Sequence, residues 1–164
     1  MFFFGAFIGS FILPRVADLI GRRPIYLFGL SLYCLTALFH PFSGSIYFTF
    51  ILIFLGGISE SGRYYVGFVY LQELMPPSKW QTYSGLMIFI VHAIAKICYD
   101  LYFYKISKNW IGIGIISICF VIGALISVIR IMPESPRYLF SKGKEAEARK
   151  SFEKMCSINQ GVLN

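Results

Sequence analysis

Five long runs of apolar residues follow one another along the chain, separated by short polar segments. They cover about residues 1–19, 24–40, 46–72, 82–104 and 110–131. Apolar side chains fill these runs almost continuously rather than at alternating positions, and a helix needs roughly 20 such residues to cross a bilayer. Because a spanning segment must satisfy its own backbone hydrogen bonds in lipid, the pattern predicts helices. Residues 1–132 are therefore expected to form a bundle of five transmembrane helices.

The segment 133–164, which follows the last apolar run, has a different pattern and is rich in charged residues. Within residues 145–156, apolar side chains recur at helical spacing at Ala148, Phe152 and Met155. An apolar stripe on an otherwise charged helix is typical of a helix that lies on a membrane surface instead of crossing it. We therefore expect a short amphipathic helix here, followed by a tail.

Composition supports a membrane location. Hydrophobic residues make up 57% of the 164 residues and charged residues only 14%, against roughly 25% charged residues in an ordinary soluble domain. The net charge of +7 comes from basic residues at the edges of the apolar runs, and no nucleic-acid-binding motif occurs, so no nucleic-acid partner is expected. The four cysteines lack zinc-site spacing, and no catalytic motif is visible. We expect a multi-pass membrane protein in contact with lipid, with no enzymatic activity, metal or cofactor.

Basic residues are distributed unevenly between the polar segments. If every run crosses the membrane, Arg22, Arg23, Lys79 and the basic residues of segment 133–164 all lie on one side. The segments on the opposite side carry far fewer basic residues. Because basic loops remain in the cytoplasm, this bias places segment 133–164 and its amphipathic helix on the cytoplasmic side. The same bias holds for the plasma membrane and for organelle membranes, so it does not choose between them.

The loop between the first two runs carries a specific motif. Residues 14–24 read PRVADLIGRRP, in which the glycine permits a tight turn between two helices. The loop resembles the signature G-x-x-x-D-[RK]-x-G-[RK]-[RK] of the major facilitator superfamily, which lies between its second and third transmembrane helices. Four positions match this signature: Asp18, Gly21, Arg22 and Arg23. Pro14 and Leu19 depart from it, in the places of a glycine and a basic residue.

A second motif follows the last apolar run. Residues 133–139 read PESPRYL and match, at every position, the signature that follows the sixth helix in sugar porters and related organic-ion transporters. A basic segment rich in Glu and Ala comes next, as it does in that family. A weaker likeness lies in YLQELMPPSK, where Glu73 and Pro76 resemble the family's E-x-x-P segment after its fourth helix. Lys79 stands one position earlier than the usual arginine.

The resemblance implies a fold as well as a family. The chain is expected to be an all-α membrane protein, with five transmembrane helices that correspond to helices two to six of the family's N-terminal bundle, plus a cytoplasmic amphipathic helix. The family has twelve helices in two halves, and the substrate is held between the halves. The first helix and the second half have no counterpart here. We therefore expect this chain to act together with a missing C-terminal half or with other transmembrane chains.

The resemblance also implies a cytoplasmic gating network of carboxylates and arginines, built from the three loop motifs. Its members here would be Asp18, Arg22, Arg23, Glu73, Glu134 and Arg137. Ion pairs of this kind stabilise one conformation of a transporter, and breaking them costs free energy when that side opens. The alternative interpretation of each residue is a charged side chain that merely extends to the membrane surface.

Ionisable residues also occur inside the predicted spans, where they are costly and usually functional. Glu60 and Arg63 are three residues apart in the third span, whereas His92, Lys96 and Asp100 share one helical face of the fourth. One interpretation is that Glu60, Arg63, His92 and Lys96 line a polar cavity that binds a substrate or a proton. The other is a set of ion pairs that packs the two helices together. The sequence favours neither.

Two functions remain open. The first is a secondary transporter that moves a small polar solute, such as a sugar or an organic ion, by alternating access. The second is a transporter-derived structural subunit of a larger membrane complex, without transport activity. The helices without a counterpart and the departures at Pro14 and Leu19 favour the second. The motifs identify neither the substrate nor a coupling ion, because they belong to the gate.

Overall fold

The computed structural model describes residues 1–75, 77–105 and 108–160, and it describes their side chains except at 77–81, 84, 87–92 and 158–160. These residues form helices and no strand, which confirms the all-α prediction for the described part of the chain. The helices of the bundle are α1 (Phe2–Ile20), α2 (Arg22–Phe39), α3 (Ile46–Ser61), α4 (Gly67–Leu74), α5 (Pro77–Lys105) and α6 (Trp110–Arg130). The shorter or peripheral segments are η1 (His40–Phe42), η2 (Gly62–Val66), α7 (Pro136–Ser141) and α8 (Glu145–Gln160).

The turn between α1 and α2 is a single residue. Gly21 has φ 129°, a backbone conformation that side-chain-bearing residues rarely adopt, and its N–H donates to the carbonyl of Ala17 at 3.0 Å. Arg22 then begins α2 directly, with Pro24 in the first turn, where proline costs no hydrogen bond. The predicted second run, which begins at residue 24, therefore starts two residues too late. This short turn fixes both arginines at the start of a helix.

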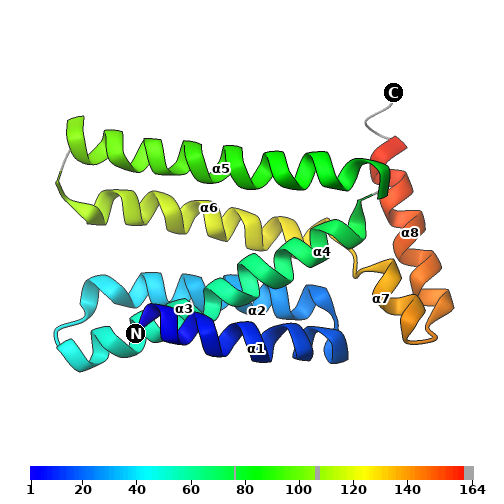
Figure 1. The fold of residues 1–164 in the computed structure, drawn as a ribbon, viewed down its shortest axis with the longest axis horizontal. Helices are drawn as coiled ribbons and strands as arrows, with labels where there is room; N and C mark the ends of the chain where they lie inside the picture. Colours follow the sequence, from blue (N-terminus) through cyan, green and yellow to red (C-terminus); the bar gives the residue numbers. More distant parts are fainter. Residues whose placement is uncertain (76, 106–107, 161–164) are drawn as a thin grey trace.

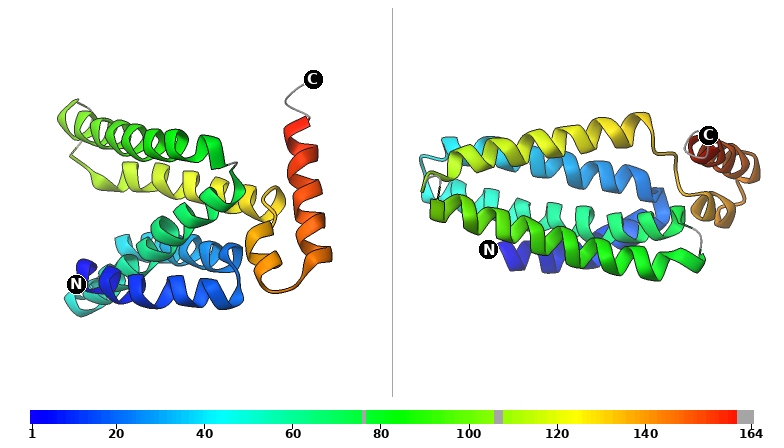
Figure 2. Two further views of the ribbon diagram at one scale, coloured as in Figure 1. Left: turned by 45° about the vertical axis from the view of Figure 1, so that its right-hand side comes forward. Right: turned by 90° about the horizontal axis from the view of Figure 1, so that it is seen from above.

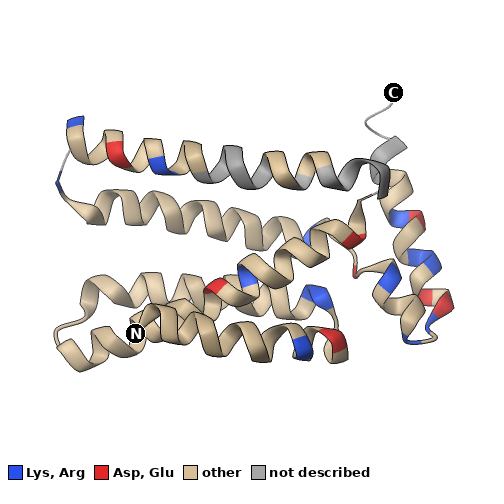
Figure 3. Ribbon diagram, viewed as in Figure 1, with Lys and Arg blue, Asp and Glu red and all other residues tan. Residues whose placement is uncertain are grey.

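The helices divide into two groups around an oblique central one. Figure 1 shows α1 and α2 on one side and α5 and α6 on the other, with the continuous segment α3–η2–α4 passing between them. Two further views show that α8 runs crosswise at the end of the bundle where α6 leads into α7 (Figure 2). We call this end, which includes the Gly21 turn, α7 and α8, the charged end. Many of the Lys and Arg residues lie along the ribbon at this end, as Figure 3 shows.

Small residues let α1 and α3 pack backbone to backbone. A Cβ atom added to Gly5 would lie 2.1 Å from the carbonyl oxygen of Phe54, and one added to Gly57 would lie 2.1 Å from that of Phe2. Further along the same contact, the hydroxyl of Ser61 donates to the carbonyl of Ala6 at 2.8 Å. Close approach through small residues is the common way in which helices associate in lipid, where apolar burial supplies little driving force.

The predicted third run, residues 46–72, is not one regular α-helix. It consists of α3, the π-helical segment η2 and α4 in direct succession. The backbone of α2 approaches this segment closely, since a Cβ added to Gly29 would lie 2.8 Å from the nitrogen of Arg63. Single π turns inside helices are frequent at functional sites. Here the π segment begins two residues after Glu60 and contains Arg63.

Three of the described helical stretches are long and apolar enough to cross a membrane: Phe2–Ile20, Arg22–Phe42 and Trp110–Arg130. Large apolar side chains on α1 point outward, and Phe3, Phe7 and Phe11 are 86%, 61% and 58% exposed. Apolar patches of this kind are unfavourable in water and suit contact with lipid. The count of five spans and the cytoplasmic position of α8 remain predictions.

Candidate functional site

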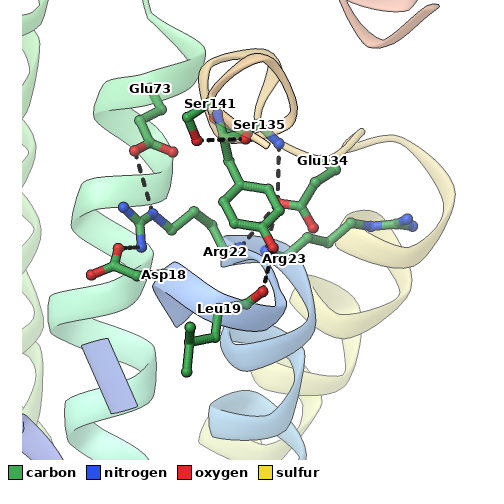
Figure 4. A network of polar contacts seen from close by, with 9 residues as sticks. Asp18, Leu19, Arg22, Arg23, Glu73, Glu134, Ser135 and Ser141 are labelled. Atoms are coloured by element: carbon green, nitrogen blue, oxygen red, sulfur yellow. Dashed lines mark hydrogen bonds and ion pairs between the residues drawn. The ribbon is translucent and has the colours of Figure 1, made fainter. Parts of the chain in front are cut away.

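Arg22 connects α1 with α4 at the charged end. One guanidinium nitrogen pairs with Asp18, one turn earlier at the end of α1, and Nε lies 3.3 Å from Oε1 of Glu73 on α4 (Figure 4). The side chains of Arg22 and Glu73 are each only 16% exposed. Partial removal from water strengthens such a pair relative to one on an open surface. These two ion pairs therefore hold the α1–α2 turn against the end of α4.

Glu134 acts on the backbone of the same turn. Its Oε1 accepts hydrogen bonds from the backbone N–H groups of Arg22, Arg23 and Ser135, at 3.0, 3.1 and 3.1 Å. The first N–H groups of a helix have no partner inside it and carry a partial positive charge, so a carboxylate there is stabilising. A Cβ on Gly21 would lie 2.7 Å from the other oxygen of Glu134, so glycine also provides room for this carboxylate.

The side chain of Arg23 points to a different helix. Its guanidinium donates to the carbonyls of Ile129 at 2.7 Å and Val128 at 3.5 Å, in the last turn of α6. A cation at a helix C-terminus is favourable, because the last carbonyls carry a partial negative charge. The buried Nε of Arg23 has no hydrogen-bond partner among the described residues. The two adjacent arginines thus connect α2 to α4 and to α6, respectively.

Two tyrosines that are not among the six predicted gating residues complete the charged end. The hydroxyl of Tyr70, which is 1% exposed, donates to the carbonyl of Pro133, and the hydroxyl of Tyr138 donates to the carbonyl of Leu19 at 2.7 Å. A tyrosine in an apolar span gives no signal of its own, whereas Tyr138 lies within the PESPRYL motif. These bonds attach the segment after α6 to α4 and α1.

Replacing Tyr70 with phenylalanine is expected to lower the free energy of unfolding by about 1–2 kcal/mol, because the Pro133 carbonyl loses its donor. The measurement is denaturant-induced unfolding of the purified protein in detergent, followed by circular dichroism. Tyr47→Phe is the matched control, since Tyr47 is 78% exposed. An equal change in both variants would show that the Tyr70 bond contributes nothing specific.

Arg137 is not brought into this network. It is exposed at the start of α7 and makes no ion pair with any residue that the structure describes. Pro76 of the E-x-x-P segment and the side chain of Lys79 lie outside the described residues. Of the six predicted gating residues, the structure therefore places five in mutual or shared contact: Asp18, Arg22, Arg23, Glu73 and Glu134.

A cavity of about 540 Å³ lies between α2, α3, α5 and α6. Glu60 and Arg63 form an ion pair in its wall, and each side chain is 31% exposed. The Arg63 guanidinium also lies over the ring of Tyr33, 4.4 Å from its centroid, a distance that gives a favourable cation–π contact. The Tyr33 hydroxyl and that of Ser117 are 3.0 Å apart, which links α2 to α6. Most of the other lining residues are apolar, and we call this space the polar cavity after its ion pair.

The fourth predicted span, which is α5, lines the polar cavity with aromatic residues and not with its described charged ones. Lys96 and Asp100 are exposed on α5 and are not among the residues that line the polar cavity, whereas Tyr99 and Phe103 of the same helix are. The side chain of His92 lies outside the described residues. The structure therefore brings Glu60 and Arg63 together and does not bring Lys96 to them. Among the described side chains, no group of three or more His, Cys, Asp or Glu is arranged to hold a metal.

Comparison with known proteins identifies the family of the chain. Residues 1–161 match the family described as Sugar (and other) transporter. Among relatives, Solute carrier family 22 member 15-like of Xenopus laevis is 31% identical over 159 residues, which is 97% of this chain and 32% of that protein. Human Organic cation/carnitine transporter 2 is 25% identical over 99% of this chain and 29% of its own length. Putative metabolite transport protein YwtG of Bacillus subtilis is 29% identical over 92% of this chain and 33% of its own length.

These relatives are transporters, so the family is not one of enzymes, and the apolar helices are those of a multi-pass integral membrane protein. The chain spans about a third of the length of the relatives that it matches. Because the family match covers almost all of its residues, the chain belongs to the Sugar (and other) transporter family of the major facilitator superfamily.

Proposed function

We propose that the protein that carries this chain moves a small polar solute, such as a sugar or an organic ion, across a membrane by alternating access. The observation that carries the proposal is the network at the charged end, which joins α1, α2, α4 and the end of α6 through few side chains. Contacts of this kind form in one conformation of a transporter and are broken in the other, which is what a gate requires. The names of two relatives refer to organic cations, carnitine and metabolites, which fits a small polar cargo.

In this proposal the charged end is cytoplasmic and the described conformation is closed there. The concentration of Lys and Arg at that end supports the orientation, because basic segments remain in the cytoplasm. Opening toward the cytoplasm would separate Arg22 from Glu73 while α1 and α2 stay joined through Gly21. The proposal also includes five membrane-spanning helices and a position for α8 on the cytoplasmic surface of the membrane.

The polar cavity is the proposed place where the solute contacts this half of the transporter. The carboxylate of Glu60 suits a cationic or hydroxyl-bearing solute, and it is held in place by Arg63. A solute that binds Glu60 replaces part of the contact with Arg63, whose charge the Tyr33 ring continues to stabilise. Lys96 and His92 remain proposed members of the cavity that the described contacts do not support.

Replacing Glu60 with glutamine, or Arg63 with alanine, is expected to reduce uptake at least about tenfold, equivalent to 1.4 kcal/mol. The protein that carries this chain is reconstituted in liposomes, and uptake of labelled glucose, tetraethylammonium and carnitine is measured. Glu153→Gln is the control, because Glu153 lies on α8, with its side chain 64% exposed. Unchanged uptake in both cavity variants would rule out the cavity assignment. Absence of any uptake by the unaltered protein, across these solutes, would favour the structural-subunit alternative.

A further inference from the structure

A second cavity, of about 500 Å³, lies at the charged end between α8, α7 and the ends of α1 and α2. Five basic side chains line it: Arg23, Lys142, Lys144, Lys150 and Lys154. Among the described residues of this lining, only Glu134 and Glu147 are acidic, so the formal net charge of the described wall is +3. We call it the basic cavity. It is separate from the polar cavity, with which it shares no lining residue among those described.

The acidic residues do not neutralise the cations that face this space. Glu134 directs one oxygen to three backbone N–H groups, and Glu147 lies 3.5 Å from the ammonium group of Lys144. The other four basic side chains have no carboxylate partner among the described residues. Lys154 instead donates to the carbonyl of Arg130 at 3.4 Å. Several positive charges therefore converge without counterions.

The position of the basic cavity matches the depth of lipid headgroups. Its lining includes Ile20, the last residue of the membrane-length helix α1, and Pro133, three residues after the end of α6. Helix α8, which lies at the end of the bundle (Figure 1), contributes Glu147, Lys150, Ser151 and Lys154 to the lining. A site at the junction between apolar helix ends and a basic surface helix is where bilayer phosphates lie. Apolar Ile20 and Leu139 in the same wall provide contact for the glycerol and upper acyl region.

We propose that the basic cavity binds the phosphorylated headgroup of an anionic phospholipid. The net charge of the wall favours a headgroup with more than one phosphate, and a volume of about 500 Å³ lies within the range of small-molecule sites. Arg23, which belongs to this wall, also holds the last turn of α6, and its backbone is held by Glu134. An occupied cavity therefore stabilises the closed arrangement of the charged end. The proposal depends on membrane insertion of the bundle and not on the identity of the transported solute.

The test measures binding of dioctanoyl phosphatidylinositol 4-phosphate to the full protein that carries this chain, purified in a neutral detergent, by microscale thermophoresis. The double variant K150Q/K154Q is expected to weaken binding about 25-fold, since each Lys or Arg near an anionic surface contributes roughly fivefold. R149Q/K105Q removes the same charge elsewhere, because Arg149 pairs with Glu153 and lines a different groove while Lys105 ends α5 at the opposite end. This control is expected to change the affinity less than twofold.

Three outcomes would overturn the proposal. Equal losses in the two double variants would show a diffuse electrostatic attraction instead of a site. Equal affinity for dioctanoyl phosphatidylcholine would show that the negative headgroup is not recognised. Inositol 1,4-bisphosphate binding as tightly as the lipid would assign the cavity to a soluble phosphorylated compound. Melting temperatures measured without lipid establish that both variants are folded. Because the experiment measures lipid binding, a negative result would contradict the lipid site and leave the transport proposal intact.

Discussion

Replacing Gly57 with leucine is expected to prevent α1 from packing on α3 and to lower the free energy of unfolding by at least about 3 kcal/mol. Any Cβ at this position meets the carbonyl oxygen of Phe2 at 2.1 Å and the nitrogen of Ala6 at 2.8 Å. Both are backbone atoms, which cannot rotate away as a side chain does, so the two helices must separate. The measurement is the yield of monodisperse protein in size-exclusion chromatography together with its melting temperature in detergent.

The neighbouring residue provides a matched control for this prediction. A Cβ at Gly56 meets no atom within 4 Å among the described residues outside its own helix, so Gly56→Leu adds the same side chain to the same helix without the backbone contact. We expect this variant to keep a melting temperature close to that of the unaltered protein. Similar yields and melting temperatures for both variants would contradict the close α1–α3 contact.

Replacing Glu134 with alanine is expected to lower the free energy of unfolding by about 2–4 kcal/mol and to loosen the start of α2. Three backbone N–H groups lose a charged acceptor, and helix-capping contacts and charge-assisted hydrogen bonds each contribute about 1–3 kcal/mol. Glu134→Gln keeps an acceptor oxygen without the charge, so its free energy of unfolding should lie between those of Glu134→Ala and the unaltered protein. Hydrogen–deuterium exchange of the peptide around residues 18–26 checks the local effect, and thermal unfolding checks the global one.

Glu147→Ala serves as the control at the same end of the bundle. Its side chain is 60% exposed and faces a single lysine at 3.5 Å, and exposed pairs contribute little to stability. This variant is expected to leave exchange at residues 18–26 unchanged. Faster exchange there in Glu147→Ala, to the same degree as in Glu134→Ala, would indicate a general effect of negative charge rather than capping by Glu134.

The helical content could be predicted from the sequence because lipid leaves few choices for an apolar run. The positions of helix ends were harder to predict: α5 begins at Pro77, whereas the apolar run starts near residue 82. Hydrophobicity marks the part of a helix that lies in lipid, and a helix extends beyond that part wherever its first turn is otherwise satisfied. The short helix α7 was not predicted at all. It depends on a local contact, the Ser135 hydroxyl accepting from the N–H of Tyr138 at 3.2 Å.

Five of the six residues predicted for the charged network lie in it and Arg137 does not, whereas the partner of each residue was not predictable. The loop motifs pointed to carboxylates and arginines, and the structure does pair Arg22 with Asp18 and Glu73. Glu134, however, binds backbone N–H groups, and Arg23 binds carbonyls of α6. A sequence motif gives the charge at a position, whereas the choice between a side-chain and a backbone partner depends on where helix ends lie. The Glu60–Arg63 pair was predictable because it needs only the helical spacing of three residues.

The π segment η2 has a consequence for the opposite end of its own helix. A π turn accommodates an additional residue, and each residue of an α-helix rotates the following side chains by about 100°. The angular phase of α4 is therefore set at Gly62–Val66, roughly 15 Å along the axis from Glu73. Without this segment, Tyr70 and Glu73 would be turned away from Pro133 and Arg22. One widened turn beside Arg63 thus determines which side chains of α4 face the charged end. It thereby sets how the polar cavity and the proposed gate are oriented relative to each other on the same helical segment.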